Sequence, residues 1–396
     1  MSRDTHRSFM YGAVVPVLLS IALYGCEKSP TASQDTSGDL VVRIGASAPL
    51  TGPQAHLGKD NENGTRMAID DANAKGIMIG GRKAHFELIS EDDQADPKTA
   101  TIVAQKLVDD KVNGVIGHLN SGTTIPAAKI YSDNGIPQIS PSATAVAYTA
   151  QGFKTAFRVM ANDAQQGHVL GEYAAKNLGA KRIAVIDDRT AYGQGLADQF
   201  IKSAEASGAK IVAHEYTTDK AMDFTAVLTA VKGKKPDLLF YGGMDAQSGP
   251  MVKQLKALAL KTKILTGDGG YTPEFIRLAG DAAEGAYASL PGVPLDKMPG
   301  GKAFADRFIA KYGPIQLYAP YCYDAVNVMI AAMQKAGSAD PAKYLPALAD
   351  ITYDGVTAKI QFDEKGDLKG GAITMYQVQH GKWQPLETLG TARAAN

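Results

Sequence analysis

From residue 40 onward, short apolar runs alternate with longer stretches in which apolar residues recur every three or four positions. The short runs are rich in β-branched residues, as buried strands are, and the longer stretches have the spacing of one helix face. In residues 97–110, for example, Ala100, Val103, Leu107 and Val108 share such a face. This alternation predicts an α/β protein with parallel sheets. Strands are expected at residues 40–45, 84–89, 112–116, 137–140, 182–186, 211–214, 236–241 and 263–266, and helices at 61–74, 97–110, 126–134, 163–178, 193–206, 224–232, 251–258, 302–312 and 321–336.

The stretch 112–144 carries hydroxyl groups beyond the ends of two of these strands. Ser121 follows strand 112–116, and Thr144 follows strand 137–140. In an open parallel sheet, ligands bind in the crevice beyond the carboxyl ends of the strands. Ser121 also lies near a helix start, where unpaired N–H groups and the helix dipole attract an anion. The alternative is that both residues only cap helices.

A second series of elements begins after Arg158. Its first helix is expected to start with a variant capping box at residues 163–166 and to end at Gly179. Further along, Asp268 lies in a glycine-rich turn directly after strand 263–266. By itself, an aspartate in such a turn is more often solvated than functional. The series as a whole predicts a second doubly wound sheet.

The first 26 residues have the features of an export signal. A run without charged residues, 9–23, follows a weakly basic start, and it is short for a membrane span, which needs about 20 residues. Leu23-Tyr24-Gly25-Cys26 resembles a bacterial lipobox, in which the cysteine is lipidated. The alternative is ordinary signal cleavage near Gly25. Residues 27–39 are mostly polar and are expected to form a flexible tether.

Composition and cysteine content narrow the function further. Lys+Arg and Asp+Glu are equal at 41 each, so no basic surface for nucleic acid is expected. The two cysteines are Cys26 and Cys322. If Cys26 is lipidated, Cys322 has no partner for an internal disulfide. Roughly 370 residues remain after removal of the signal, which is enough for two lobes.

The usual catalytic and metal-binding signatures are missing. There is no dinucleotide fingerprint after the first strand, no Walker sequence, no nucleophile elbow and no HExxH, which disfavours an enzyme and predicts no cofactor. Asp60, Asp92, Asp93 and Asp96 lack EF-hand spacing and are interpreted as a solvated acidic surface, so no metal is expected. His118 lies in the loop after strand 112–116. No nucleophile is evident beside it, so it is interpreted as structural.

Several stretches, in order along the chain, resemble the periplasmic leucine/isoleucine/valine-binding proteins, which are solute receptors of ABC importers. They are GVIGHLNSGTTIPAAKIYSDNGIPQISPSATA (114–145), AYGQGLA (191–197), LFYGG (239–243), AGDAAEG (279–285) and DEKGDLKG (363–370). The resemblance implies the type I periplasmic-binding-protein fold, in which two Rossmann-like lobes with parallel central sheets are joined by three hinge crossings. The crossings are placed near Met160, Leu290 and Gly370. The implied segments are a signal with lipobox at 1–26, a tether at 27–39, lobe 1 at 40–160 plus 291–370, and lobe 2 at 161–290 plus 371–396.

The resemblance also implies a site for a free α-amino acid, whose carboxylate and ammonium each need a partner when they are sequestered from water. Ser121 and Thr144 match the family's hydroxyl groups for the ligand carboxylate. Ser142 and Ala143 match positions that contribute backbone atoms. Asp268 matches the acidic partner of the ammonium, and some relatives have glutamate there.

Other residues are implied as walls of the side-chain pocket. Tyr192 matches an aromatic residue that approaches the ligand from the second lobe. Tyr318 resembles an aromatic wall, and nearby Tyr321 is the alternative for that place. Leu57 and Met244 stand where some relatives have tyrosine, which makes the pocket more aliphatic and more adaptable.

These observations predict a lipid-anchored receptor, periplasmic or at the cell surface, that acts as a monomer. It would deliver leucine, isoleucine, valine or a similar aliphatic amino acid to an inner-membrane ABC permease by hinge closure. The alternatives are the same fold with another ligand (an amide, a small aromatic acid or another amino acid), a sensory ligand-binding module, and an exported α/β enzyme. Asp268 argues against a ligand without a cationic group.

Overall fold

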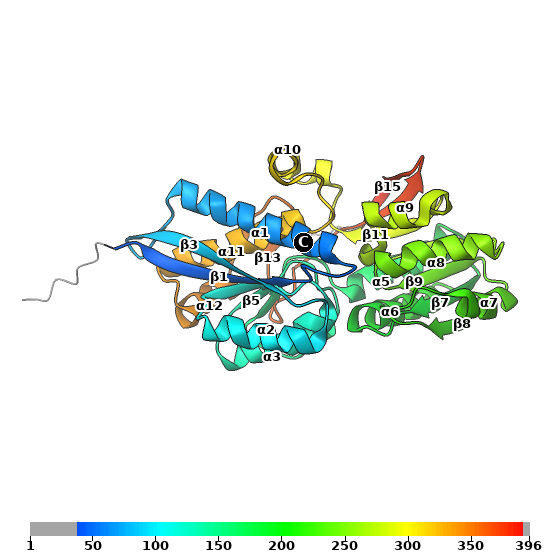
Figure 1. Cartoon of the computed structure of the whole chain (residues 1–396), viewed down its shortest axis with the longest axis horizontal. Helices are drawn as coiled ribbons and strands as arrows, with labels where there is room; N and C mark the ends of the chain where they lie inside the picture. Colours follow the sequence, from blue (N-terminus) through cyan, green and yellow to red (C-terminus); the bar gives the residue numbers. More distant parts are fainter. Residues whose placement is uncertain (1–37, 391–396) are drawn as a thin grey trace, which may run out of the picture. The chain divides into compact units, whose positions relative to one another are not determined.

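The computed structural model describes residues 38–390, and two β-sheets organise them (Figure 1). Each sheet carries its own set of helices, and the two layered units are called the first and second lobe below. The predicted signal and lipobox, including Cys26, lie outside the described residues, as do most of the tether and residues 391–396.

The first sheet is mostly parallel. Its pairs are parallel apart from one short antiparallel pair at the edge. Strands that are covered on both faces need continuous apolar runs, and residues 114–117 and 138–140 are buried throughout. The strands lie in the order β2 (Met78–Ile79), β3 (Arg82–Asp92), β1 (Leu40–Ala48), β4 (Gly114–Gly117), β5 (Gln138–Ser140) and β6 (Ala156–Arg158).

The second sheet is mixed. It has a parallel part and, at one edge, a hairpin that pairs antiparallel. Sequence analysis predicted neither the hairpin nor the inner strand at residues 287–291. The strands lie in the order β15 (Lys382–Leu389), β14 (Ile373–Gln379), β11 (Tyr287–Pro291), β10 (Lys263–Thr266), β9 (Leu238–Gly242), β7 (Arg182–Asp187) and β8 (Lys210–Tyr216).

Helices cover both sheets, and their packing defines the two lobes. The first lobe contains α1 (Ala55–Lys75), α2 (Pro97–Asp109), α3 (Ser121–Asp133), α4 (Ala147–Ala150), α10 (Gly301–Tyr312), α11 (Ala319–Ala336), α12 (Pro341–Ala349) and the small pair β12 (Thr352–Asp354) and β13 (Lys359–Gln361). The second lobe contains α5 (Asp163–Lys176), α6 (Ala191–Ala206), α7 (Thr225–Gly233), α8 (Asp245–Ala257) and α9 (Pro273–Ala279). Short 3₁₀ turns are η1 (Asp268–Gly270), η2 (Gly280–Ala283) and η3 (Leu295–Lys297).

The chain crosses between the sheets at three places. It leaves the first sheet after β6, returns to the first lobe after β11, and crosses again before β14. The expected crossings near Met160 and Gly370 fall in the first and third of these connections, and Leu290 lies at the end of β11, just before the second. The residues at which one lobe ends and the other begins remain predictions.

Several helices begin earlier than the sequence pattern indicated. α3 starts at Ser121 instead of residue 126, and α8 starts at Asp245 instead of residue 251. Proline is usually found in the first turn of a helix. Pro126 and Pro250 stand inside their helices, and the polar turns before them are helical.

Two interpretations of polar residues were wrong. The capping box of α5 is formed by Asn162 with Gln165, so Asp163 is the first helical residue and not the cap. Asp60 and Asp93 are buried rather than solvated. Asp60 accepts the N–H groups of residues 316, 317 and 319 at 2.9, 3.0 and 2.8 Å, and it thereby holds the loop that leads into α11. Asp93 accepts from His118 at 2.8 Å, which agrees with a structural role for that histidine.

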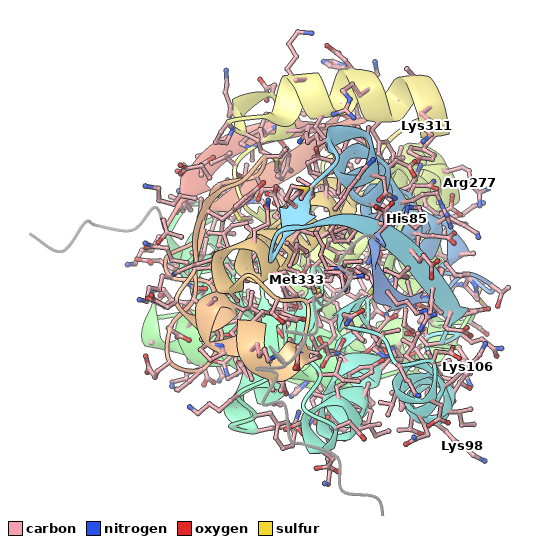
Figure 2. The ribbon with its side chains drawn as sticks, turned by 90° about the vertical axis from the view of Figure 1, so that its left-hand side faces the viewer. His85, Lys98, Lys106, Arg277, Lys311 and Met333 are labelled. Atoms are coloured by element: carbon pink, nitrogen blue, oxygen red, sulfur yellow. The ribbon has the colours of Figure 1, made fainter. Side chains whose placement is uncertain are left out.

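The surface and the interior differ as expected for a folded globular chain. Figure 2 shows Lys98, Lys106, Arg277 and Lys311 at the periphery, whereas Met333 lies inside and is fully buried. Between residues 38 and 390, no helix combines the length and apolar character that a membrane crossing requires.

Candidate functional site

The hydroxyl residues predicted from the sequence lie together at the N-terminus of α3. The Ser121 Oγ accepts the N–H of Ala145 at 3.1 Å, which leaves the hydroxyl hydrogen available for another acceptor. Thr144 is fully buried, and its Oγ1 has no hydrogen-bond partner within residues 38–390. The Ser142 Oγ donates to the carbonyl of Leu119 at 3.1 Å. Ser121 and Thr144 therefore present donors beside the N–H groups of Ser121 and Gly122, which have no acceptor within their helix, whereas the N–H of Thr123 donates to the carbonyl of Asn120 at 3.1 Å.

Two other residues predicted for the site, Ala143 and Leu57, are already engaged or fully buried. The N–H of Ala143 donates to the Ser140 Oγ at 2.9 Å, and its carbonyl accepts from the Arg158 Nη1 at 2.8 Å. The backbone of Ala143 is thus already engaged. Leu57 is fully buried in the first turn of α1, whereas Gln54, just before that helix, borders the cavity described below.

Asp268 forms the acidic centre of the site. It lies in η1 just beyond β10 and is 1% exposed. The Tyr192 hydroxyl donates to its Oδ1 at 2.9 Å, and the Tyr318 hydroxyl donates to its Oδ2 at 2.7 Å. Tyr318 comes from the first lobe, so this carboxylate joins the lobes. Tyr321 donates instead to a backbone carbonyl, which leaves Tyr318 as the tyrosine that reaches the site.

The electrostatics around Asp268 favour a cation. Burial raises the pKa of the Asp268 carboxyl, and the hydrogen bonds from Tyr318 and Tyr192 oppose this rise. Both tyrosines are neutral donors, so they stabilise the carboxylate without cancelling its charge. A bound ammonium would supply the missing charge.

Asp163 is a site residue that sequence analysis missed. It is fully buried. The Thr144 hydroxyl lies close enough to lower the pKa of Asp163, but no contact of either carboxylate oxygen within residues 38–390 has full hydrogen-bond geometry. Its N–H donates to the carbonyl of Thr144 at 2.8 Å, which ties α5 to the hydroxyl loop. Burial, followed by the negative charge of Asp268, raises the pKa of Asp163 to about 8.

The acceptors near Asp163 outnumber the donors. The Gln166 Nε2 donates to the Ser289 Oγ at 2.9 Å, but its Oε1 is buried and has no partner within residues 38–390. An ammonium group carries three N–H donors and accepts nothing, so it matches this surplus of acceptors.

The sequence signal that could have revealed Asp163 was the pair Asn162-Asp163. Both residue types cap helices, and when Asn162 caps α5 the carboxylate of Asp163 is left for another partner.

A cavity of about 440 Å³ opens between the lobes beside these groups. Gln54, Asn120 and Gly122 border it from the first lobe, and the last two flank Ser121. Tyr192 and Met244, which sequence analysis placed at the side-chain pocket, border it from the second lobe. The volume is within the range of about 300–1,000 Å³ that is typical of small-molecule sites.

A histidine–carboxylate contact also joins the lobes. The His56 Nε2 in α1 lies 2.7 Å from the Oδ2 of Asp245 in α8, which also accepts from the Thr272 hydroxyl at 2.6 Å. Burial alone would lower the pKa of His56, but the hydrogen bond and charge of Asp245 outweigh it and the pKa is raised.

We expect His56→Gln to weaken ligand binding by roughly threefold to tenfold, because one partly exposed, charge-assisted hydrogen bond between the lobes is lost. The loss should appear in the ligand off-rate, measured by stopped-flow displacement, because a contact formed on closure delays opening. His85→Gln, an exposed histidine on β3, is the matched control. Equal off-rates for the two variants would contradict a closing role for His56.

The geometry defines a two-lobed binding protein with an inter-lobe site. The chain belongs to the periplasmic binding protein family, whose sequence pattern matches residues 41–382. The predicted type I fold is thereby confirmed, and membership in a family of extracytoplasmic binding proteins agrees with the expectation that the chain is not an enzyme.

Individual relatives cover most of the chain. The leucine-, isoleucine-, valine-, threonine- and alanine-binding protein of Pseudomonas aeruginosa is 37% identical over 87% of this chain and 92% of its own length. A Leu/Ile/Val-binding protein of Rhizobium johnstonii is 36% identical over 86% of this chain and 92% of its own. Among solved structures, the leucine-binding protein LivK of Thermotoga maritima aligns with a TM-score of 0.82 at 28% identity, covering 88% of this chain and 99% of that one. The LivJ protein of Streptococcus pneumoniae in complex with isoleucine aligns with a TM-score of 0.79 at 28% identity, with the same coverage.

Proposed function

We propose that this chain is the solute-binding receptor of an ABC importer and that it binds a branched-chain or similar aliphatic amino acid between its lobes. The observation that carries the proposal is the pair of buried carboxylates, Asp268 and Asp163, beside the hydroxyl loop of Ser121 and Thr144. An α-amino acid places its ammonium on the acids and its carboxylate on the hydroxyls and helix N–H groups. The ligands named for the relatives at 36–37% identity support the same class.

The mechanism is hinge closure of two lobes. Lobe 1 comprises 40–160 and 291–370, and lobe 2 comprises 161–290 and 371–396. In this reading the contacts Tyr318–Asp268 and His56–Asp245 belong to the closed arrangement, which the permease recognises before it receives the amino acid. A sensory role would use the same closure with a different partner.

We expect leucine, isoleucine or valine to bind more tightly than glycine by more than about tenfold, because each buried methylene contributes about 0.8 kcal/mol. Met244 borders the cavity and adds an aliphatic side chain to the side-chain end of the site. Titration calorimetry with the common amino acids, short amides and aromatic acids tests the proposal. A charged amino acid as the best ligand, or equal binding of isovalerate, which lacks the ammonium, would overturn it.

We also propose that Cys26 is lipidated and anchors the receptor to a membrane. Radiolabelled palmitate should be incorporated into the parent and into Cys322→Ser, but not into Cys26→Ser. Cys322 is buried in α11, so it is a control for loss of a thiol. The Cys26→Ser protein should leave the membrane fraction. A mature N-terminus elsewhere, found by mass spectrometry, would refute the anchor.

A further inference from the structure

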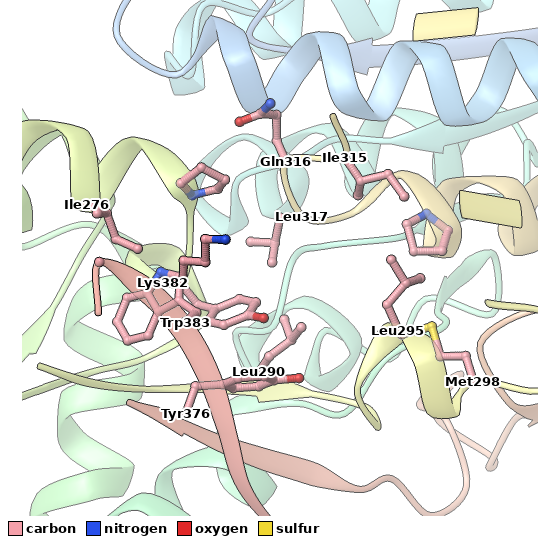
Figure 3. Close-up of a pocket in the computed structure, with 14 residues that line it drawn as sticks. Ile276, Leu290, Leu295, Met298, Ile315, Gln316, Leu317, Tyr376, Lys382 and Trp383 are labelled. Carbon is pink, nitrogen blue, oxygen red and sulfur yellow. The ribbon is translucent and has the colours of Figure 1, made fainter. Parts of the chain in front are cut away.

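A second pocket lies next to the loops that carry Asp268 and Tyr318 (Figure 3). Its volume is about 360 Å³, and its walls come from residues 315–320, from residues 271–276, from β11 and η3, and from the hairpin β14–β15. Leu317 directly precedes Tyr318 in the chain. The residues that border this pocket are all different from those that border the cavity beside Ser121, so the two spaces are separate.

The walls of this pocket are aromatic and aliphatic. The Tyr271 ring lies 4.2 Å from the Tyr376 ring and 5.4 Å from the Trp383 ring, measured between centroids. The Trp383 Nε1 donates to the carbonyl of Thr272 at 2.9 Å, which fixes the indole in the wall. Leu290 contributes to the floor of this pocket. Such walls suit a flat or branched apolar group.

Lys382 supplies the charge. It is the one charged side chain among the described residues that border the pocket, and within residues 38–390 no carboxylate lies within ion-pair distance of its Nζ. Figure 3 shows the Lys382 side chain above Trp383, with its ammonium directed toward Leu317. In the neighbouring hollow, Asp296 lies 3.5 Å from the Nζ of Lys297. The pocket itself therefore presents a single positive charge over an apolar floor.

We propose that this pocket is a second binding site and that it takes a small apolar carboxylate. The apolar body would lie between Tyr271, Trp383 and Leu290, and the carboxylate would meet the Lys382 ammonium. A free amino acid is the poorer occupant here, because no acidic side chain among the described lining residues could pair with its ammonium. The site thus differs in chemistry from the cleft at Asp268.

The chain carries a built-in reporter for this pocket, because Trp383 is its single tryptophan. The test is titration of the full-length receptor with phenylacetate, using phenylacetamide as the uncharged analogue of the same shape, while tryptophan emission is recorded. We expect a saturable change with phenylacetate and about fivefold weaker binding of the amide. Lys382→Met should weaken phenylacetate binding to the level of the amide. Lys253→Met, an exposed lysine on α8, should leave it unchanged.

A variant that fills the pocket tests whether the change in tryptophan emission comes from binding in this pocket. Ile315→Phe places extra volume in the wall and should remove most of the binding, with an unchanged circular dichroism spectrum as the check on folding. Equal affinity for phenylacetate and phenylacetamide would overturn the proposal. Phenylacetate binding that survives both Ile315→Phe and Lys382→Met would overturn it as well. So would displacement of phenylacetate by leucine, or an emission change that depends on the protein concentration and not on the phenylacetate concentration.

Discussion

Replacing Asp268 with alanine is expected to reduce amino-acid affinity by more than about a hundredfold. The change removes the carboxylate that faces the ligand ammonium inside a buried site, and breaking such a pair typically costs about 3–5 kcal/mol. It also leaves the hydroxyls of Tyr192 and Tyr318 without their acceptor. Asp268→Asn keeps the shape and one acceptor, so we expect its loss to be near the lower end, on the order of a hundredfold.

The measurement is titration calorimetry with the best amino acid, together with thermal melts of the ligand-free variants. Asp198→Ala, an exposed aspartate on α6 in the same lobe, is the matched control and should bind like the parent. Because Asp268→Ala leaves two buried tyrosine hydroxyls without their acceptor, its ligand-free melting temperature is expected to fall, and the titration is made well below it. If Asp268→Ala binds as tightly as the parent, Asp268 is not the ammonium partner.

The affinity for the amino acid is expected to rise with pH between about pH 6 and about pH 8. In the closed arrangement without a ligand, burial and then the charge of Asp268 raise the pKa of Asp163 to about 8, so its carboxyl holds a proton at neutral pH. A bound ammonium lowers that pKa, so the complex holds fewer protons than the free protein. By linkage, affinity then increases with pH up to the free-state pKa, by at most about tenfold per unit.

Asp163→Asn should bind more weakly and lose this pH dependence, because the amide cannot titrate. His56 has the opposite effect on the pH dependence of binding. Because its pKa is raised, lowering the pH protonates the imidazole, and the protonated form makes the stronger contact with Asp245. The measurement is therefore made in the His56→Gln background as well, where the Asp163 slope should be steeper. Calorimetry in buffers of different ionisation enthalpy should detect proton release on binding at neutral pH. Binding without proton exchange and without pH dependence would contradict the role of Asp163.

Periodicity predicted most elements of the fold, because buried parallel strands and amphipathic helices leave clear patterns. It failed for β15, whose residues 382–389 are half-exposed, include Pro385 and show no apolar run. An edge strand packs on one side only, so its sequence carries little burial signal. It also placed the starts of α3 and α8 too late, because polar first turns that border a cleft do not show an apolar face.

The candidate site was predicted in part. Ser121, Thr144 and Asp268 were predicted because each follows an apolar strand, where an α/β sheet binds ligands, and because each matches a position of the resembled family. Asp163 was hidden behind its apparent role as a helix cap. Tyr318 was matched to the family as a wall, but its hydrogen bond to Asp268 joins residues that are 50 positions apart.

The sequence by itself determined the α/β class, the alternation of elements and the strand ends that carry polar groups, because these depend on local spacing and on burial. Only the tertiary structure decided which polar groups meet. It brought Asp163 to the hydroxyl loop with no charged partner for its carboxylate among the described residues, paired Tyr318 with Asp268 and His56 with Asp245 across the lobes, and left Lys382 over an aromatic pocket. Such contacts join segments that are distant in the sequence and depend on how whole lobes pack. Local sequence patterns therefore do not predict them.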